Sequence, residues 1–326
     1  MAAASAIGYA SSARLRPIEL LPWALALAVF FFAPTYQPLA AYVLIIILFA
    51  LSLDLIVGYG GIVTLGHSAY FGLGAYVAGV FAVRVTGDPL IGLAVAAAGA
   101  GLFGLVTGAV ILRTHGLALL MLTLAITSIV LEVANKWTTV TGGADGLHSV
   151  PIQPILGYFR FDMFGRTAFV YCLIVVALCW WLVRTIVYSP FGVSLAGTRE
   201  NDVRMAAVGA PVYRRRLLAY TISCTLAGIA GALLTQTTQF VGLSVLGFEL
   251  SGELLVMLVL GGVRRIYGAF VGPVVFLVAK DYLAKQFPEY WYLGIGILLI
   301  VIVMFARGGI LGILDGVLDR LRRGRR

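Results

Sequence analysis

Charged residues are scarce in this chain. Asp, Glu, Lys and Arg make up 11% of its 326 residues, whereas hydrophobic residues make up 61%. A soluble domain is usually about 25% charged and about 45–50% apolar. This composition, with a mean hydropathy of +1.02, excludes a single water-soluble core and predicts a bundle of membrane-spanning helices.

Groups that could carry chemistry are also few. The three cysteines lie inside apolar runs without metal-ligand spacing, and the three histidines lie at the ends of apolar runs or in loops. No G-x-x-x-x-G-K-[ST] sequence, the loop that cradles ATP phosphates, is present, and the only lysines are Lys136, Lys280 and Lys285. We therefore expect no catalytic residue, metal or cofactor in this chain, and expect any ATP to be bound by a partner subunit.

Apolar stretches of roughly 17–25 residues, the length that crosses a bilayer, recur along the chain. We expect an all-α polytopic membrane protein with about ten spans, at residues 18–34, 39–57, 68–86, 90–112, 116–134, 167–187, 217–236, 246–263, 268–284 and 290–306. No A-x-A cleavage site follows the first span, so we interpret it as an uncleaved anchor. Small residues at four-residue spacing, such as Ala100, Gly104 and Gly108, should let these helices pack closely.

The basic residues indicate how the spans are oriented. With the N-terminus in the cytoplasm, most of the 23 Lys and Arg residues fall in cytoplasmic segments, as the positive-inside rule requires. This bias explains the net charge of +9 without nucleic acid. We therefore expect both termini in the cytoplasm. The expected units are a cytoplasmic tail at 1–16, a transmembrane domain at 17–314 with an external loop at 135–166 and a cytoplasmic loop at 188–216, and a basic tail at 315–326.

The loop at 188–216 is the long basic interruption of this apolar chain. It carries five arginines, its residues 200–208 have helix-forming composition, and Gly209-Ala210-Pro211 should end that helix. Such a loop can be the site at which a soluble partner protein binds the membrane domain. The alternative is a solvated connector whose arginines only set the topology.

Glycine is concentrated in the segment GYGGIVTLGHSAYFGLGAY, residues 58–76. Gly58, Gly60 and Gly61 end an apolar run and should break or bend a helix. Broken helices often line a transport route, so these glycines and His67 are pathway candidates. The alternative is a tight hairpin near the inner face.

Three acidic residues, Asp54, Glu132 and Glu253, lie inside the expected spans. A carboxylate at the bilayer centre costs about 2.5–3.5 kcal/mol on insertion scales. Asp54 and Glu132 lie near span ends, where structural hydrogen bonding is the expected role. Glu253 lies about two turns into its span and is the candidate to face a water-filled route.

Four stretches carry a resemblance to a known family. They are LDLIVGYGGIVTLGHSAYFGLGAY at 53–76, LRTHGLALLMLTLA at 112–125 leading to WTTVTGGADGL at 137–147, SPFGVSLAGTRENDVRMAAVGAPVYRRRLLAYTISCTLAGIAGALL at 189–234, and SGELLVMLVLGG at 251–262. On these residues the chain resembles the membrane permease subunits of branched-chain amino acid ABC importers, of the LivM type.

The resemblance implies a function and a set of partners. The function is import of branched-chain or related hydrophobic amino acids across the bacterial cytoplasmic (inner) membrane, by a multi-pass permease with the ABC importer fold. The implied partners are a second homologous permease subunit, two cytoplasmic ATPase subunits that bind the ATP, an extracytoplasmic solute-binding protein and membrane lipid. Urea, short amides and aromatic acids are alternative solutes. An ion-coupled secondary transporter is a separate hypothesis, which the few ionisable residues disfavour.

The resemblance also implies roles for particular residues. The basic loop resembles the coupling segment that docks into the ATPase, with its implied contacts at Glu200, Ala206, Ala207, Gly209, Arg199 and Arg204. The external TGGADGL turn supplies candidates for contact with the binding protein, at Gly142, Gly143, Asp145 and Gly146, although turn chemistry alone also explains the glycines.

The sequence departs from the family pattern after Gly261-Gly262. Arg264 to Ala269 intervene before the expected Gly-Pro, the proline appears as Pro273, and Ala306 replaces the usual proline before Arg307. We expect these changes to alter packing at the inner ends of two spans, and to leave the coupling segment untouched.

Overall fold

The computed structural model of this chain describes residues 21–32, 34–155, 157–159, 165–286, 293–294, 296 and 309–312. The expected tails at 1–16 and 315–326, and most of the expected span at 290–306, lie outside the described residues.

The described residues are predominantly helical, which confirms the all-α class. The main helices are α2 (Leu21–Phe32), α3 (Gln37–Asp54), α4 (Ser68–Arg84), α5 (Pro89–Ile111), α6 (Leu117–Lys136), α8 (Arg166–Val187), α11 (Val212–Thr238), α12 (Phe248–Gly261) and α13 (Gly268–Gln286). The connecting helices are η2 (Pro34–Tyr36), the π-helix η3 (Leu55–Tyr59), α7 (Thr138–Thr141), η4 (Gly143–Asp145), α9 (Pro190–Glu200), α10 (Asp202–Ala207) and η5 (Leu243–Leu246). The described part of the chain has isolated β-bridges but no strand.

Five of the described helices are long and apolar enough to cross a membrane: α3 with η3, α5, α6, α8 and α11. They coincide with five of the expected spans, although α11 begins earlier, at Val212. The helices α4 and α12 have 17 and 14 residues, because non-helical chain takes up part of the length expected for each. The chain is therefore a multi-pass membrane protein in which some expected spans are only partly helical.

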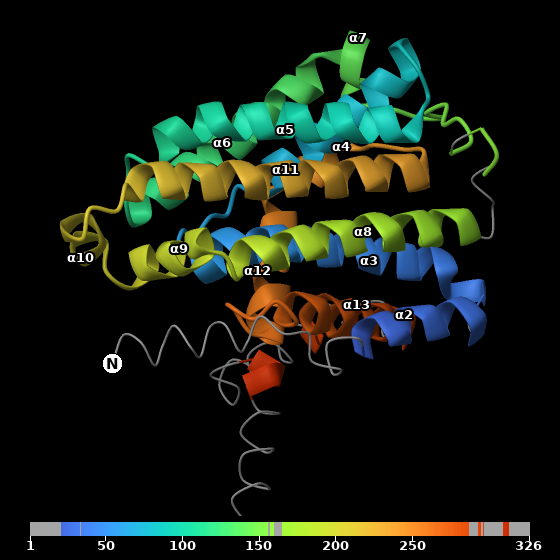
Figure 1. Ribbon diagram of the computed structural model, residues 1–326. Helices are drawn as coiled ribbons and strands as arrows, with labels where there is room; N and C mark the ends of the chain where they lie inside the picture. Colours follow the sequence, from blue (N-terminus) through green and yellow to red (C-terminus); the bar gives the residue numbers. More distant parts are fainter. Residues whose placement is uncertain are drawn as a thin grey trace, which may run out of the picture.

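The helix α3 lies inside the bundle. Figure 1 shows α4, α5, α6 and α11 on one side, α3 and α8 in the middle, and α13 and α2 on the other side. The most extensive contacts of α3 are with α8, α11 and α13. Of the most apolar window in α3 with η3, 83% is buried by protein, against 22% for α6. A break at the end of α3 is therefore surrounded by other helices rather than by lipid.

Close packing of α11 against its neighbours depends on small residues. A Cβ at Gly231 would fall on the Phe71 carbonyl of α4, and one at Gly228 would fall on Ala100 of α5. A Cβ at Gly104 would meet the Cys224 side chain in the same way. The four-residue ladder predicted on α5 is thus confirmed as a packing surface for α11.

The contact at Gly231 predicts a loss of stability on a small substitution. Gly231→Ala should lower the free energy of unfolding by about 1–3 kcal/mol, because the added methyl group meets backbone that cannot move aside. Thermal unfolding of the detergent-purified chain, followed by tryptophan fluorescence, measures this. Gly252→Ala is the matched control, since a Cβ there meets nothing within 4 Å and alanine favours a helix. Equal melting temperatures for the two variants would contradict the prediction.

Candidate functional site

The connection between α8 and α11 contains two short helices, α9 and α10, which project at one end of the bundle (Figure 1). Ser189 precedes α9 and accepts a hydrogen bond from the Gly192 amide, and Pro190 occupies the first helical position. Asn201 then interrupts the helix with an extended backbone, and its side chain accepts from the Arg204 amide at 2.9 Å. The helix expected within residues 200–208 is therefore present as α10, which begins at Asp202 because the Asn201 side chain caps it.

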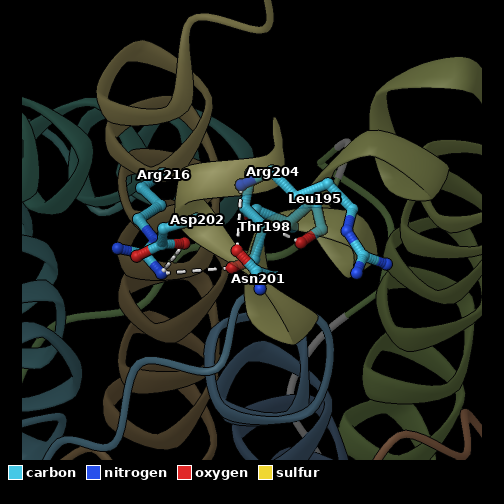
Figure 2. Close-up of polar contacts among 6 residues, drawn as sticks. All are labelled: Leu195, Thr198, Asn201, Asp202, Arg204 and Arg216. Atoms are coloured by element: carbon cyan, nitrogen blue, oxygen red, sulfur yellow. Dashed lines mark hydrogen bonds and ion pairs between the residues drawn. The ribbon is translucent and has the colours of Figure 1, made fainter. Parts of the chain in front are cut away.

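One half-buried arginine holds α10 against the rest of the protein. The Arg216 guanidinium of α11 lies 2.6 Å from Asp202 Oδ1 and donates to the Thr198 carbonyl at 3.4 Å (Figure 2). The Arg216 side chain is 16% exposed. These two contacts join both short helices to the start of α11, so the segment has a defined position although no α10 residue is buried.

The outward face of α10 is apolar and basic. Val203 and Val208 are 80% and 78% exposed, and Ala206 and Ala207 are exposed beside them. The Arg204 side chain points away from the Arg216–Asp202 pair (Figure 2). Exposed apolar groups gathered on one short helix are typical of a surface that another protein covers. The two valines were not predicted, because their spacing does not follow a helical stripe.

Gly209 ends this exposed face. Its φ of +85° lies in the left-handed region that favours glycine, and a Cβ there would meet nothing within 4 Å. The predicted end of the helix at Gly209 is confirmed.

Arg199 and Glu200 are exposed residues whose side chains contact other parts of the protein. Arg199 donates to the Gly58 carbonyl, and its Cγ would lie 2.6 Å from a Cβ on Gly61. Glu200 lies 3.6 Å from the Arg264 guanidinium. Two sets of candidates that the sequence keeps apart, the coupling segment and the glycine break, are therefore in contact. The expectation that the departure at Arg264 leaves the coupling segment untouched is wrong, because the Arg264 side chain reaches Glu200.

The predicted break at the end of α3 is confirmed. The helix widens into the π-helix η3, Gly60 follows, and Gly61 turns the chain with a φ of +69°. Asp54, fully enclosed one turn earlier, accepts a hydrogen bond from the Arg264 amide at 2.8 Å. Asp54 therefore has the structural hydrogen-bonding role expected for it.

After this break, residues 60–67 run without regular structure before α4 begins. His67 ends the run, stacks on Phe49 with 5.4 Å between ring centroids, and lies with Nε2 2.9 Å from Ser52 Oγ. Because Ser52 donates its own proton to the Phe49 carbonyl, the pattern assigns the His67 proton to Nε2. Ser68 then donates its amide to Ser251 of α12 at 2.8 Å. His67 is fully buried, so in this conformation it fixes irregular backbone against α3.

Glu253 is paired across two helices. Its carboxylate lies 3.0 and 3.2 Å from the Lys280 Nζ of α13, and the two side chains are about equally exposed, at 30% and 31%. An ion pair lowers the cost of both charges in the membrane. This partner could not be inferred from the sequence, because Lys280 belongs to a different expected span.

The predicted external turn is formed around α7 and η4. Gly142, Gly143 and Gly146 all have positive φ angles, so the turn geometry requires glycine at each. Gly143 and Gly146 are buried, whereas Asp145 is exposed. Contact with a binding protein stays a prediction, and Asp145 is the candidate best placed to make it.

Two cavities lie near these sites. One, of about 400 Å³, is formed by residues 61–63 and the turn between α5 and α6, with Arg216 at its edge. Another, of about 410 Å³, is lined mainly by apolar side chains of α4 and α6 and by Trp137. Among the residues that the structure describes, no group of three or more His, Cys, Asp or Glu side chains could hold a metal ion.

The helices, the protein-covered break in α3 and the exposed α9–α10 segment define a polytopic α-helical membrane protein of the transport permease class. Residues 36–303 match the family described as "Branched-chain amino acid transport system / permease component", and the chain belongs to this family.

Curated relatives agree with this assignment. The chain is 27% identical over 299 residues to the "High-affinity branched-chain amino acid transport system permease protein LivM" of Salmonella typhimurium, covering 84% of this chain and 69% of the relative. It is 26% identical to the protein of the same name from Escherichia coli, with the same coverage. It is also 26% identical over 278 residues to a "Probable branched-chain amino acid transport permease protein LivH" of Methanocaldococcus jannaschii, covering 80% of this chain and 85% of the relative. No solved structure matches the chain.

The Arg216–Asp202 ion pair predicts how firmly α10 is held. Arg216→Met should speed amide hydrogen exchange across residues 202–208 by roughly fivefold, since a partly exposed charged hydrogen bond stabilises by about 1 kcal/mol. Hydrogen exchange with mass spectrometry measures this. Arg214→Met removes an exposed arginine two positions away and should leave the exchange unchanged. An equal increase in both variants would show that loss of charge, and not of this contact, is responsible.

Proposed function

We propose that this chain is the membrane-embedded permease subunit of an ATP-binding-cassette importer that carries branched-chain or related hydrophobic amino acids. The observation that carries the proposal is the α9–α10 segment, which projects from a bundle of the permease family with an exposed face of Val203, Ala206, Ala207 and Val208. A membrane helix bundle driven by a separate ATPase needs such a surface. The names of the relatives support the solute class.

The other subunits of the importer are inferred from the missing ATP-binding loop and from the names of the relatives. It has no phosphate-cradling loop, so two cytoplasmic ATPase subunits supply ATP hydrolysis. It is similar both to proteins named LivM and to one named LivH, which supports pairing with a second, homologous permease. An extracytoplasmic binding protein delivers the solute, with the exposed Asp145 turn as its contact.

We infer that the α9–α10 segment faces the cytoplasm, where an ATPase can reach it. The basic residues of the loop favour the cytoplasmic side, and the relatives from Salmonella and Escherichia support a bacterial inner membrane. Both termini are then cytoplasmic. In the resulting cycle, ATP closes the ATPase pair, α9 and α10 move, and the permease pair opens to one side. A solute shifts this equilibrium only by its different affinity for the two states.

Reconstitution tests the proposal. The full complex in liposomes contains this chain, its homologous partner, the ATPases and the binding protein. These liposomes should accumulate radiolabelled leucine when ATP is supplied on the side of the membrane that the ATPases face. Liposomes containing this chain alone should accumulate none. Concentrative uptake by the single chain, driven by an ion gradient, would replace the proposal with a secondary transporter. ATP-dependent uptake of urea, amides or aromatic acids instead of leucine would change only the solute.

Gly209 provides a test of the docking surface. Gly209→Trp should abolish uptake and release the ATPase subunits, because an indole at this exposed turn blocks close approach by a partner, while membrane insertion is unchanged. Gly209→Asn is the matched control, since asparagine tolerates the left-handed backbone at this position. Co-purification of the ATPases and leucine uptake are the measurements. Normal uptake by the tryptophan variant would show that nothing docks here.

A further inference from the structure

Gly58 is the point at which three segments distant in the sequence meet. Its carbonyl accepts from Arg199 of α9. A Cβ at Gly58 would fall on Asp54 Oδ1 and would lie 2.9 Å from the Arg264 amide. The end of α3, the segment proposed to dock the ATPase, and the turn between α12 and α13 are therefore joined around one residue that has no room for a side chain.

Arg264, in that turn, has an unfavourable backbone conformation that several contacts hold in place. Its φ is +67°, in the left-handed region that residues other than glycine seldom adopt. Its amide donates to Asp54, its carbonyl accepts from the Tyr59 hydroxyl at 3.4 Å, and its guanidinium lies 3.6 Å from Glu200. Strained backbone that surrounding contacts hold in place is concentrated at functional and switching sites.

The two arginine side chains are poorly suited to stabilising the fold. The Arg264–Glu200 pair is 40% and 69% exposed, and exposed ion pairs contribute little to stability. Arg199 is likewise an exposed residue, and its guanidinium donates to the Gly58 carbonyl. Each arginine instead links two parts of the chain. Arg199 links the α9–α10 segment to the broken end of α3, and Arg264 links the same segment to the α12–α13 turn.

From these contacts we infer that Arg199 and Arg264 are positioning residues that transmit movement of the α9–α10 segment to the inner ends of α3 and α12. When α9 moves, Arg199 displaces the Gly58 carbonyl in the π-helix, and Glu200 displaces the Arg264 turn that begins α13. Because Asp54 joins these two points, α3 and α12 move together. This inference rests on the proposed function, since the movement of α9 is driven by the ATPase.

The test separates coupling from folding. In proteoliposomes of the full complex, we measure solute imported and ATP hydrolysed in the same sample. Arg199→Met keeps the aliphatic contact with Gly61 but removes the donor to Gly58. Arg264→Gly removes the guanidinium, and glycine adopts the φ of +67° without strain, so the amide still reaches Asp54. Arg214→Met, on an exposed arginine of the same loop, is the control for loss of charge.

The expected result is a lower yield of transport per ATP. Both Arg199→Met and Arg264→Gly should lower the ratio of solute imported to ATP hydrolysed by at least about fivefold, the lower end of typical coupling between two sites. Arg199→Lys, which keeps a flexible donor, should restore part of the ratio. The control should match the wild type. Melting temperatures of the complexes should be unchanged, because a merely structural role would change stability and not this ratio.

Each other outcome is decisive. If uptake and hydrolysis are unchanged, or fall in proportion in both variants, the arginines do not transmit movement and the inference is wrong. If Arg264→Gly does not assemble, the exposed Arg199→Met variant decides the question alone. Failure of the proposed function is distinguishable, because in that case the wild-type complex itself shows no ATP-dependent uptake.

Discussion

Hydrocarbon offers no hydrogen-bond partners, so any backbone that leaves the helical conformation within the hydrocarbon region must be satisfied by the protein itself. This chain leaves it at the end of α3 and again between α12 and α13. The Asp54 carboxylate, buried at the end of α3, satisfies the Arg264 amide of the second break. The Ser251 hydroxyl of α12 satisfies the Ser68 amide at the start of α4. The two breaks are therefore not independent, because the carboxylate at the first completes the hydrogen bonding of the second.

The same requirement explains why the broken end of α3 lies inside the bundle, where every residue of η3 is buried. Such a break needs neighbours on every side, and α11 can approach closely only because glycine and alanine line its contacts with α4 and α5. Ser223 of α11 donates to the Ser52 carbonyl of α3, and Ser52 is in turn the partner of His67. Small residues on α11 thus bring its polar groups within reach of the irregular segment. Packing and hydrogen bonding depend on each other here, and neither accounts for the arrangement alone.

Local patterns in the sequence predict much of this fold, and distant pairs account for what they miss. Hydropathy locates the five long helices, and Gly58, Gly60 and Gly61 mark the end of α3, because both signals act within a few residues. The helix break at Asn201 is local too, and an asparagine before an acidic residue could have indicated a cap. The Asp54–Arg264 bond joins residues 210 positions apart, and the Glu253–Lys280 pair joins separate helices. A single sequence carries no periodicity that relates such positions, so the contact between Arg264 and the coupling segment could not be predicted.

The contacts around Gly58 divide into two kinds that suit different tasks. Asp54 is fully enclosed, and its buried carboxylate joins α3 to the α12–α13 turn through its bond to Arg264. The Arg264–Glu200 contact is open to solvent and long for an ion pair, so it can break or re-form at little cost. The buried hydrogen bond is strong and the exposed ion pair is weak. This combination suits a moving segment, because the ion pair can change while α3 and α12 stay linked to each other. Had the external contact also been buried, movement of α9 would have left an unpaired charge inside the protein, at a cost of several kcal/mol.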